Sequence, residues 1–159
     1  MGSHIISTFN RKDVPPMAPI LSQLATVPIP PINPSVIMFY TAGVVGMPQA
    51  SDPPAEFPYD DFEQQARNSM YNIRESLALN GGSPADIVKL TWYVVGLDLE
   101  KRATLGKVLA EFFVDYDNHK PPSALIGVQR LAQDWFHVEV EAVAAMSVES
   151  GINIKREIN

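Results

Sequence analysis

The chain has 159 residues, the size of one ordinary domain, and 46% of them are hydrophobic, which is enough to build a core. Its net charge of −6 repels phosphate backbones, so we expect no nucleic-acid partner. The absence of cysteine excludes disulfides and thiolate chemistry. There is no apolar run of about 18 residues and no secretory leader, so we expect no membrane span and a cytoplasmic protein.

Proline divides the first third of the chain into short pieces. Eleven of the 14 prolines fall within residues 15–58, and proline fixes φ and removes a ladder hydrogen bond. Two strands are predicted there, at residues 24–27 and 36–41. The segment 28–34 between them is not expected to pair as a central strand. Residues 47–58, with four prolines, are predicted to form an exposed loop.

An apolar stripe at helical spacing predicts the first helix. The stripe recurs at spacings of four, four, three and four, and it consists of Phe62, Ala66, Met70, Ile73 and Leu77. Asp60 or Asp61 can cap the start of this helix. The run Asn80-Gly81-Gly82 is expected to end it, because glycine readily takes the left-handed conformation just past a helix.

A strand, a second helix and two more strands follow. The β-branched and aromatic run at residues 87–95 predicts the strand. The helix is predicted over roughly residues 100–116, with an apolar face made of Ala103, Val108, Leu109, Phe112, Phe113 and Tyr116. Residues 118–122 stop this helix with two prolines. The closing strands are predicted at 124–128 and 136–146.

This order of elements predicts an α+β domain with a mixed sheet. Strand–helix–strand steps usually make parallel, right-handed crossovers, which puts both helices on one face of the sheet. In the last strand, Phe136, Val138, Val140 and Ala142 alternate with His137, Glu139, Glu141 and Val143. The first set is expected to face the helices. The second set lies on an uncovered face, so we expect a homo-oligomer with its interface there.

Four segments of the chain have a familiar pattern. They are residues 83–91 (Ser-Pro-Ala-Asp-Ile-Val-Lys-Leu-Thr), residues 121–131, which begin Pro-Pro-Ser-Ala-Leu-Ile, residues 138–144 (Val-Glu-Val-Glu-Ala-Val-Ala), and Thr41-Ala42-Gly43-Val44. Together, and in this order over roughly residues 22–146, they resemble the Rid (YjgF) family. The resemblance divides the chain into an N-terminal extension (1–20), a Rid-like domain (21–148) and a C-terminal tail (149–159).

Membership of this family implies a fold and an activity. The fold is similar to that of chorismate mutase, and the family forms homotrimers with clefts between subunits. The best-known family activity is the hydrolysis of reactive enamines and imines to 2-keto acids and ammonia, without a metal or an organic cofactor. Some members have been described as ribonucleases or translation inhibitors, but the acidic charge argues against that role for this chain.

The chain departs from the family pattern at several site positions. The family's arginine, which grips a substrate carboxylate as a bidentate fork, falls at Ser123. The cleft tyrosine falls at Leu21, the interface asparagine near Gly106, and the glutamine after Ser-Gly at Val44. The glutamate that positions the attacking water matches Glu139. This pattern favours a substrate that is larger, more apolar or not carboxylated.

Glu139 is therefore the expected catalytic residue, because burial in a cleft would raise its pKa and suit it to acid/base work. The alternative is an ordinary solvated glutamate. Glu141 lies on the same strand face, and it is expected either to pair with Glu139 or, more often, to form an interface salt bridge. The expected substrate contacts are Ser123, Leu125, Ile126, Leu21, Thr41, Val44, Trp135 and His137.

Several of these residues have alternative structural roles. The backbone amides of Leu125 and Ile126 can hold a ligand oxygen without any side chain. Trp135 is expected at the rim of the cleft, whereas Trp92 is expected to pack in the strand layer. A lone histidine such as His137 is more often a packed or solvent-facing residue than a proton carrier.

Two further features bear on the site. The three histidines are too scattered to predict a metal site. Arg130, the nearest arginine to Ser123, lies seven residues further along, so we expect it to form a structural ion pair.

The leading hypothesis is a diverged Rid-like enzyme that acts by acid/base catalysis on a small carbonyl, enamine or imine metabolite between subunits. The expected reaction is a hydrolysis, tautomerisation or cyclisation, and its expected setting is specialised metabolism. The first alternative is an ordinary 2-imino-acid deaminase in which another group replaces the arginine. The second alternative is a non-catalytic trimer that binds a ligand or a partner.

Overall fold

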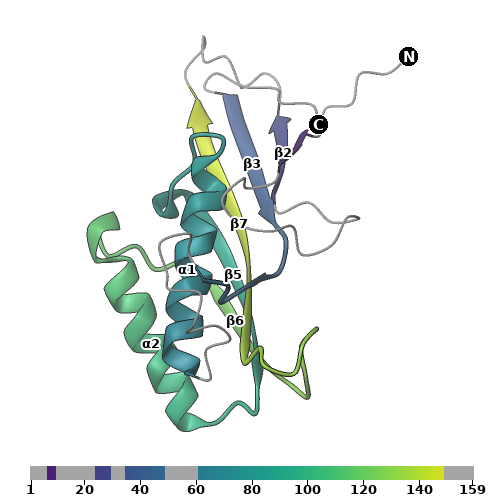
Figure 1. The fold of residues 1–159 in the computed structure, drawn as a ribbon. Helices are drawn as coiled ribbons and strands as arrows, with labels where there is room; N and C mark the ends of the chain where they lie inside the picture. The colour runs from purple at the N-terminus through teal and green to yellow at the C-terminus, as the bar shows by residue number, and fades with distance from the viewer. Residues whose placement is uncertain (1–6, 10–23, 30–34, 49–60, 149–159) are drawn as a thin grey trace.

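A computed structural model of the chain describes residues 7–9, 24–29, 35–48 and 61–148. Within these residues, the strands form one mixed sheet whose order is β1-β2-β3-β7-β5-β6, with the short β4 also paired to β7. The strands are β1 (Ser7–Phe9), β2 (Leu24–Ile29), β3 (Ser35–Thr41), β4 (Val44–Val45), β5 (Ile87–Val95), β6 (Ser123–Val128) and β7 (Val138–Val148). The helices α1 (Phe62–Ala78) and α2 (Leu99–Phe112) lie side by side on one face of this sheet (Figure 1).

The connections confirm the predicted α+β architecture. Strands β5 and β6 are parallel neighbours joined through α2. Strands β3 and β5 both pair antiparallel with β7, so they run parallel to each other, and α1 connects them. Both crossovers bring their helix to the same face. Of the described helices, none is long and apolar enough to cross a membrane.

Helix α1 follows from its predicted cap and stripe. The side chain of Asp61 accepts hydrogen bonds from the backbone amides of Glu63 (2.8 Å) and Gln64 (3.3 Å), which satisfies two of the free donors at the helix start. The predicted stripe faces the sheet, and four of its members are completely buried: Ala66, Met70, Ile73 and Leu77. They pack against Phe39, Leu90 and Val140 in the core cluster.

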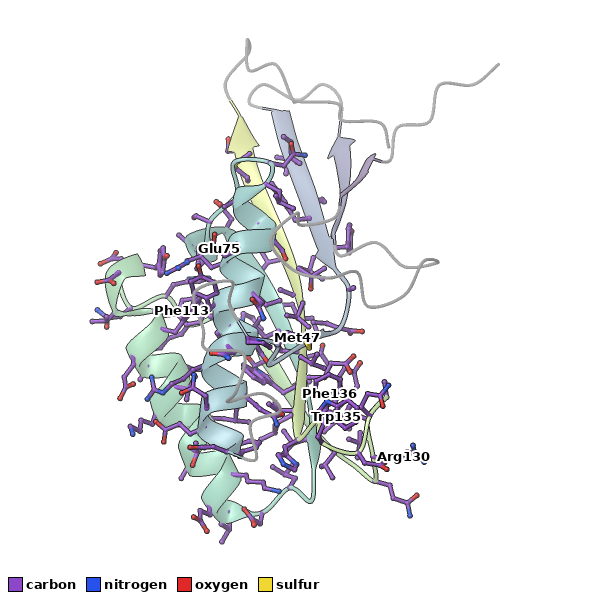
Figure 2. All side chains as sticks on the ribbon, viewed as in Figure 1. Met47, Glu75, Phe113, Arg130, Trp135 and Phe136 are labelled. Carbon is purple, nitrogen blue, oxygen red and sulfur yellow. The ribbon has the colours of Figure 1, made fainter. Side chains whose placement is uncertain are left out.

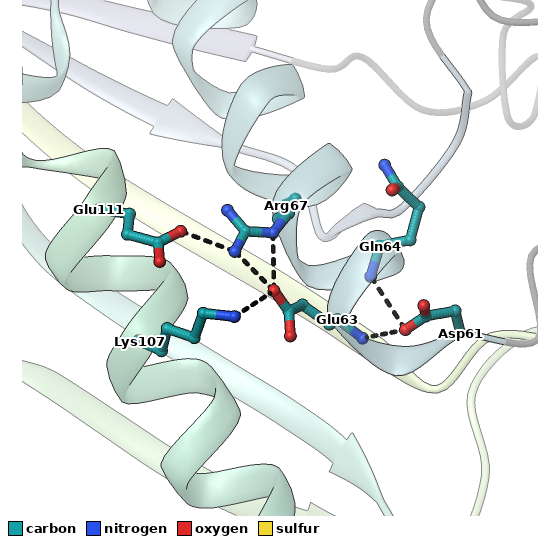
Figure 3. Close-up of polar contacts among 6 residues, drawn as sticks. All are labelled: Asp61, Glu63, Gln64, Arg67, Lys107 and Glu111. Carbon is teal, nitrogen blue, oxygen red and sulfur yellow. Dashed lines mark hydrogen bonds and ion pairs between the residues drawn. The ribbon is translucent and has the colours of Figure 1, made fainter.

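An ion-pair network joins the outer faces of the two helices (Figure 3). Arg67 of α1 contacts Glu63 on its own helix and Glu111 of α2 at 2.6 Å, and Lys107 of α2 contacts Glu63 at 3.0 Å. The hydrogen bonds from Arg67 and then Lys107 lower the pKa of Glu63. Because these side chains are solvent-accessible, each ion pair is expected to contribute little to stability, at most about 1 kcal/mol.

The observed elements differ from the predictions at their ends. Strand β2 continues through Pro28 to Ile29, where a loop was expected. Pro28 is paired with Ile37 of β3, and the described residues of β1 pair only with residues 24–26 of β2. Among the described strands, the proline therefore has one neighbour, which is the situation in which a strand tolerates proline. Helix α2 ends at Phe112, before a short 3₁₀ turn at Val114–Tyr116. Its buried residues are Leu105, which was not predicted, and Val108, which was, whereas the predicted Ala103 is exposed.

Strand β7 shows the predicted alternation. Val138, Val140 and Ala142 are at most 1% exposed beneath the helices, whereas Glu139 and Glu141 are partly exposed on the opposite face. No described element covers that opposite face. We call it the uncovered face of the sheet.

Candidate active site

Glu139 lies on the uncovered face at an irregularity of the sheet. It is paired with Tyr93 of β5 on one side and with Val45 of β4 on the other. Between the pairs Tyr40–Val143 and Val44–Val140, the β3–β4 side contains one more residue than β7, which is a β-bulge. Such bulges commonly redirect side chains beside functional sites.

Thr41 stabilises this bulge. Its hydroxyl oxygen accepts a hydrogen bond of 2.8 Å from the backbone amide of Ala142, in place of a regular ladder partner. Thr41 was predicted to contact substrate, and the structure shows that its side chain holds β7 beside the bulge.

The carboxyl group of Glu139 lies against the backbone of Gly43. A Cβ atom added at Gly43 would stand 1.8 Å from Glu139 Oε1 and 2.6 Å from its Cδ. Real atoms cannot approach this closely, so only glycine leaves room for the carboxyl group in this position. The bulge and the missing side chain together form the seat of Glu139.

The environment of Glu139 suits it to proton transfer. Burial raises its pKa first, because the charged form loses solvation, and the negative charge of Glu141 raises it further. A carboxyl group with a raised pKa holds its proton to higher pH, so it can donate a proton where a solvated glutamate could not.

Tyr93 completes a small polar cluster on the same face. Its hydroxyl donates a hydrogen bond of 3.2 Å to Glu141 Oε2. The nearby charge of Glu141 is the main reason that the pKa of Tyr93 is raised, so the phenol keeps its proton. Glu141 therefore has a partner within the chain, where an interface salt bridge was the preferred expectation.

Two buried amides of α1 hold the segments around Glu139. Gln65 donates to the Trp135 carbonyl at 2.8 Å and accepts from the His137 amide at 2.9 Å, which fixes the entry to β7. Asn72 donates to the carbonyl of Met47 at 3.0 Å and to that of Val45, which fixes β4. The entry to the strand of Glu139 and the neighbouring strand β4 are thus both attached to one helix.

Ser123 and Leu125 lie on the other face of the sheet. Their register partners in β5 are Leu90 and Trp92, both buried beneath the helices. The Ser123 hydroxyl donates to the Pro121 carbonyl at 3.0 Å and borders a pocket of about 470 Å³ between α2 and the start of β6. The pocket is lined by Leu90, Gly106, Leu109, Ala110, Phe113, Asn118, His119, Lys120, Pro121 and Ser123.

The remaining predicted contacts are divided between the two faces. Ile126 pairs with Tyr93, which is paired with Glu139, so Ile126 shares the face of Glu139. His137 lies immediately before β7, two residues before Glu139. Val44 pairs with Val140 and packs against the core. Leu21 lies outside the described residues.

The two tryptophans differ in exposure. Trp135 is 43% exposed, next to Phe136 just before β7 (Figure 2), whereas Trp92 is 2% exposed and packs in the strand layer as predicted. Arg130 forms an exposed ion pair with Asp134 at 3.5 Å. Figure 2 shows Arg130 on the far side of the molecule from Phe113, which lines the pocket beside Ser123.

Sequence reasoning did not single out Tyr93, Gln65 or the contact of Gly43 with Glu139. Tyr93 could have been found, because alternation within residues 87–95 places it on the same face as Thr91, opposite the buried Trp92. The contacts of Gln65 and Gly43 join segments far apart in the chain and leave no local pattern. Among the described residues, no group of three His, Cys, Asp or Glu side chains could hold a metal ion.

The chain is similar to known proteins over most of its length. Residues 28–146 match the family described as Endoribonuclease L-PSP. A 2-iminobutanoate/2-iminopropanoate deaminase of Escherichia coli is 32% identical over 108 residues, which cover 67% of this chain and 78% of that protein. A RutC family protein of Pyrococcus abyssi is 29% identical over 125 residues, covering 79% of this chain and 94% of that protein.

Solved structures agree with the sequence matches. The crystal structure of Escherichia coli TdcF with bound serine has a TM-score of 0.69 to this chain at 26% identity, and the match covers 89% of this chain and 99% of that one. The matched family segment contains β3 to β7 and both helices. The chain therefore belongs to the Endoribonuclease L-PSP family, the YjgF/Rid family that its sequence resembles.

Proposed function

We propose that this protein is a diverged Rid-like enzyme that acts by acid/base catalysis on a small, uncharged imine, enamine or carbonyl metabolite. The observation that carries the proposal is the seat of Glu139: a partly buried carboxyl group, packed on Gly43 and with a raised pKa. In the hydrolysis of an imine, the Glu139 carboxyl protonates the nitrogen and the resulting carboxylate then accepts a proton from the attacking water. Both roles require a pKa closer to neutrality than that of a solvated glutamate.

The pocket beside Ser123 supports an uncharged substrate. Leu90, Leu109 and Phe113 give it an apolar wall, and the Ser123 hydroxyl is already bonded to a carbonyl of its own chain. None of the described residues that line the pocket carries a guanidinium group that could pair with a carboxylate. An apolar substituent gains from burial in such a pocket, whereas an unpaired carboxylate would lose its hydration.

The substrate is proposed to bind between subunits of a homotrimer. Glu139 and the pocket beside Ser123 belong to opposite faces of one sheet, so a small ligand cannot reach both within one chain. Strand β6 ends the order of the described strands, so a second copy could approach the edge between the two faces there. The uncovered face also requires a cover. Light scattering is expected to give about three times the 17.5 kDa chain mass.

A second candidate function is the hydrolysis of 2-imino acids. The E. coli relative that is 32% identical is named for this reaction. Lys120 lines the pocket beside Ser123 and could supply a single positive charge for a carboxylate. A point charge on a flexible stem holds a carboxylate less specifically than a bidentate arginine does.

The two candidate functions predict different preferred imines, so the experiment compares two imine substrates. One substrate is 2-iminopropanoate, generated in situ and followed as pyruvate. The other is the uncharged imine of benzaldehyde and methylamine, followed as benzaldehyde. The wild type, Glu139→Gln and the exposed control Glu100→Gln are compared on both substrates, with circular dichroism confirming that each variant folds.

The proposal predicts that the wild type accelerates hydrolysis of the uncharged imine. Glu139→Gln should lower kcat/KM by about 10²- to 10⁴-fold, the usual contribution of a positioned acid/base group. Glu100→Gln should retain full activity. Faster turnover of 2-iminopropanoate would select the second candidate. Full activity in Glu139→Gln would overturn the role of Glu139, and no acceleration of either imine would favour a binding protein.

A further inference from the structure

A tyrosine stands between the two glutamates of the uncovered face. The register of β5 and β7 places Tyr93 opposite Glu139, while its hydroxyl reaches along the strand to Glu141 Oε2 at 3.2 Å. Tyr93 is thus the register neighbour of one glutamate, and its hydroxyl binds the carboxyl group of the other. No other hydrogen bond of the Glu141 side chain is seen among the described residues.

We propose that Tyr93 is a positioning residue for Glu139: its hydroxyl donates a hydrogen bond to Glu141 and holds that carboxylate as a fixed anion beside Glu139. A glutamate side chain has several rotatable bonds, so a free Glu141 would turn toward solvent and away from the like charge. The hydrogen bond to Tyr93 opposes that rotation. The proposal deepens the proposed function, because it names the groups that set the proton affinity of the catalytic carboxyl.

The charges of the cluster are consistent with this role. The charge of Glu141 is the largest cause of the raised pKa of Tyr93 and the charge of Glu139 is the smallest, so the phenol remains a donor through the neutral range. For Glu139 the largest cause of the raised pKa is burial, and the charge of Glu141 is the second. By anchoring Glu141, Tyr93 therefore keeps in place the charge that is the second cause of the raised pKa of Glu139.

Other charged groups near this face do not neutralise the pair. His137 lies immediately before β7, two residues before Glu139, and on β5, Lys89 lies exposed opposite Val143. The β4 strand brings only valines. Neither His137 nor Lys89 contributes to the raised pKa of Glu139, so Glu141 is the charge on the described chain that matters to it.

The test measures the proton affinity of Glu139 directly and needs no substrate. The full chain is labelled with ¹³C at glutamate carboxyl groups, and the chemical shift of Glu139 is followed against pH by NMR. Its signal is assigned as the one lost in Glu139→Gln. Tyr93→Phe removes only the hydroxyl, Glu141→Gln removes only the charge, and the double variant removes both.

Tyr40 offers a matched control on the same face. It pairs with Val143 of β7 and is 44% exposed, so Tyr40→Phe removes a hydroxyl from the uncovered face without touching Glu141. This variant should leave the Glu139 midpoint unchanged.

The proposal predicts that the Glu139 midpoint moves to lower pH in both Tyr93→Phe and Glu141→Gln. The double variant should move no further than Glu141→Gln alone, because the tyrosine acts only through the charge. A midpoint that moves in Glu141→Gln but not in Tyr93→Phe would refute the positioning role, and so would fully additive shifts. The NMR midpoints do not depend on turnover. If Glu139 proved unnecessary for activity, the proposed function would be overturned, but the positioning role of Tyr93 would still stand.

Discussion

Replacing Gly43 by alanine should displace the carboxyl group of Glu139 without disturbing the fold. The backbone of Gly43 does not have a positive φ, so alanine can adopt its conformation. The new Cβ would stand 1.8 Å from Glu139 Oε1, whereas ordinary contact begins at 3.4 Å, so the oxygen must move by about 1.6 Å. The atoms that must move are the end of a flexible side chain, which can turn toward solvent.

The displacement should affect activity far more than stability. A misplacement of about 1 Å in a catalytic group typically costs about 100-fold in rate, so we expect kcat/KM of Gly43→Ala to fall by at least that factor. Because the carboxyl group leaves its buried seat, the midpoint of its titration should move to lower pH. The free energy of unfolding should change by less than about 1 kcal/mol.

The assays are kcat/KM on the better of the two imines, thermal unfolding, and the NMR titration of Glu139. The matched control is Gly127→Ala on β6, where the new Cβ would meet Leu97 at an ordinary 3.4 Å. A Gly43→Ala variant with full activity and an unchanged Glu139 midpoint would refute the seat as described.

Three further predictions concern stability. Glu139→Gln should raise Tm at pH 7 but not at pH 4. The pKa of Glu139 is raised above the unfolded value of 4.5 in the folded state, so its ionisation destabilises the fold as pH rises. Glutamine cannot ionise, so the variant lacks this destabilisation at pH 7. Gln65→Leu should destabilise the protein by about 1–3 kcal/mol in urea unfolding, because it leaves the Trp135 carbonyl and the His137 amide without their partner. Asp61→Ala should cost about 1 kcal/mol by the same measurement, since it removes the cap of α1, and an unchanged midpoint would show that the cap is not needed.

The sequence was sufficient for the parts of the fold that depend on local pattern. The stripe of α1 and the alternation of β7 are periodic over many residues, so their buried faces could be predicted from spacing alone. The strands β1 and β4 contain three and two residues, too few for any period to show, and they exist because neighbouring strands offer partners.

The candidate site could be predicted only in part for the same reason. Glu139 was identified from its position on a strand that resembles the family. Its seat on Gly43 depends on one extra residue in β3–β4, which becomes visible only when β7 is paired beside it. The placement of Ser123 on the opposite face likewise depends on its pairing with Leu90, a contact between segments more than 30 residues apart.

The proposed function requires the substrate to lie between Glu139 of one chain and the pocket beside Ser123 of another. The most direct test is whether Ser123→Arg changes the preference between 2-iminopropanoate and the uncharged imine. The measurement is the ratio of kcat/KM for 2-iminopropanoate to that for the uncharged imine, in the wild type and in the variant. An arginine in the pocket can bind the carboxylate in a bidentate pair, so we predict that the ratio rises by roughly tenfold to a hundredfold. An unchanged ratio in a folded, trimeric variant would contradict the account, because it would show that the substrate does not enter this pocket.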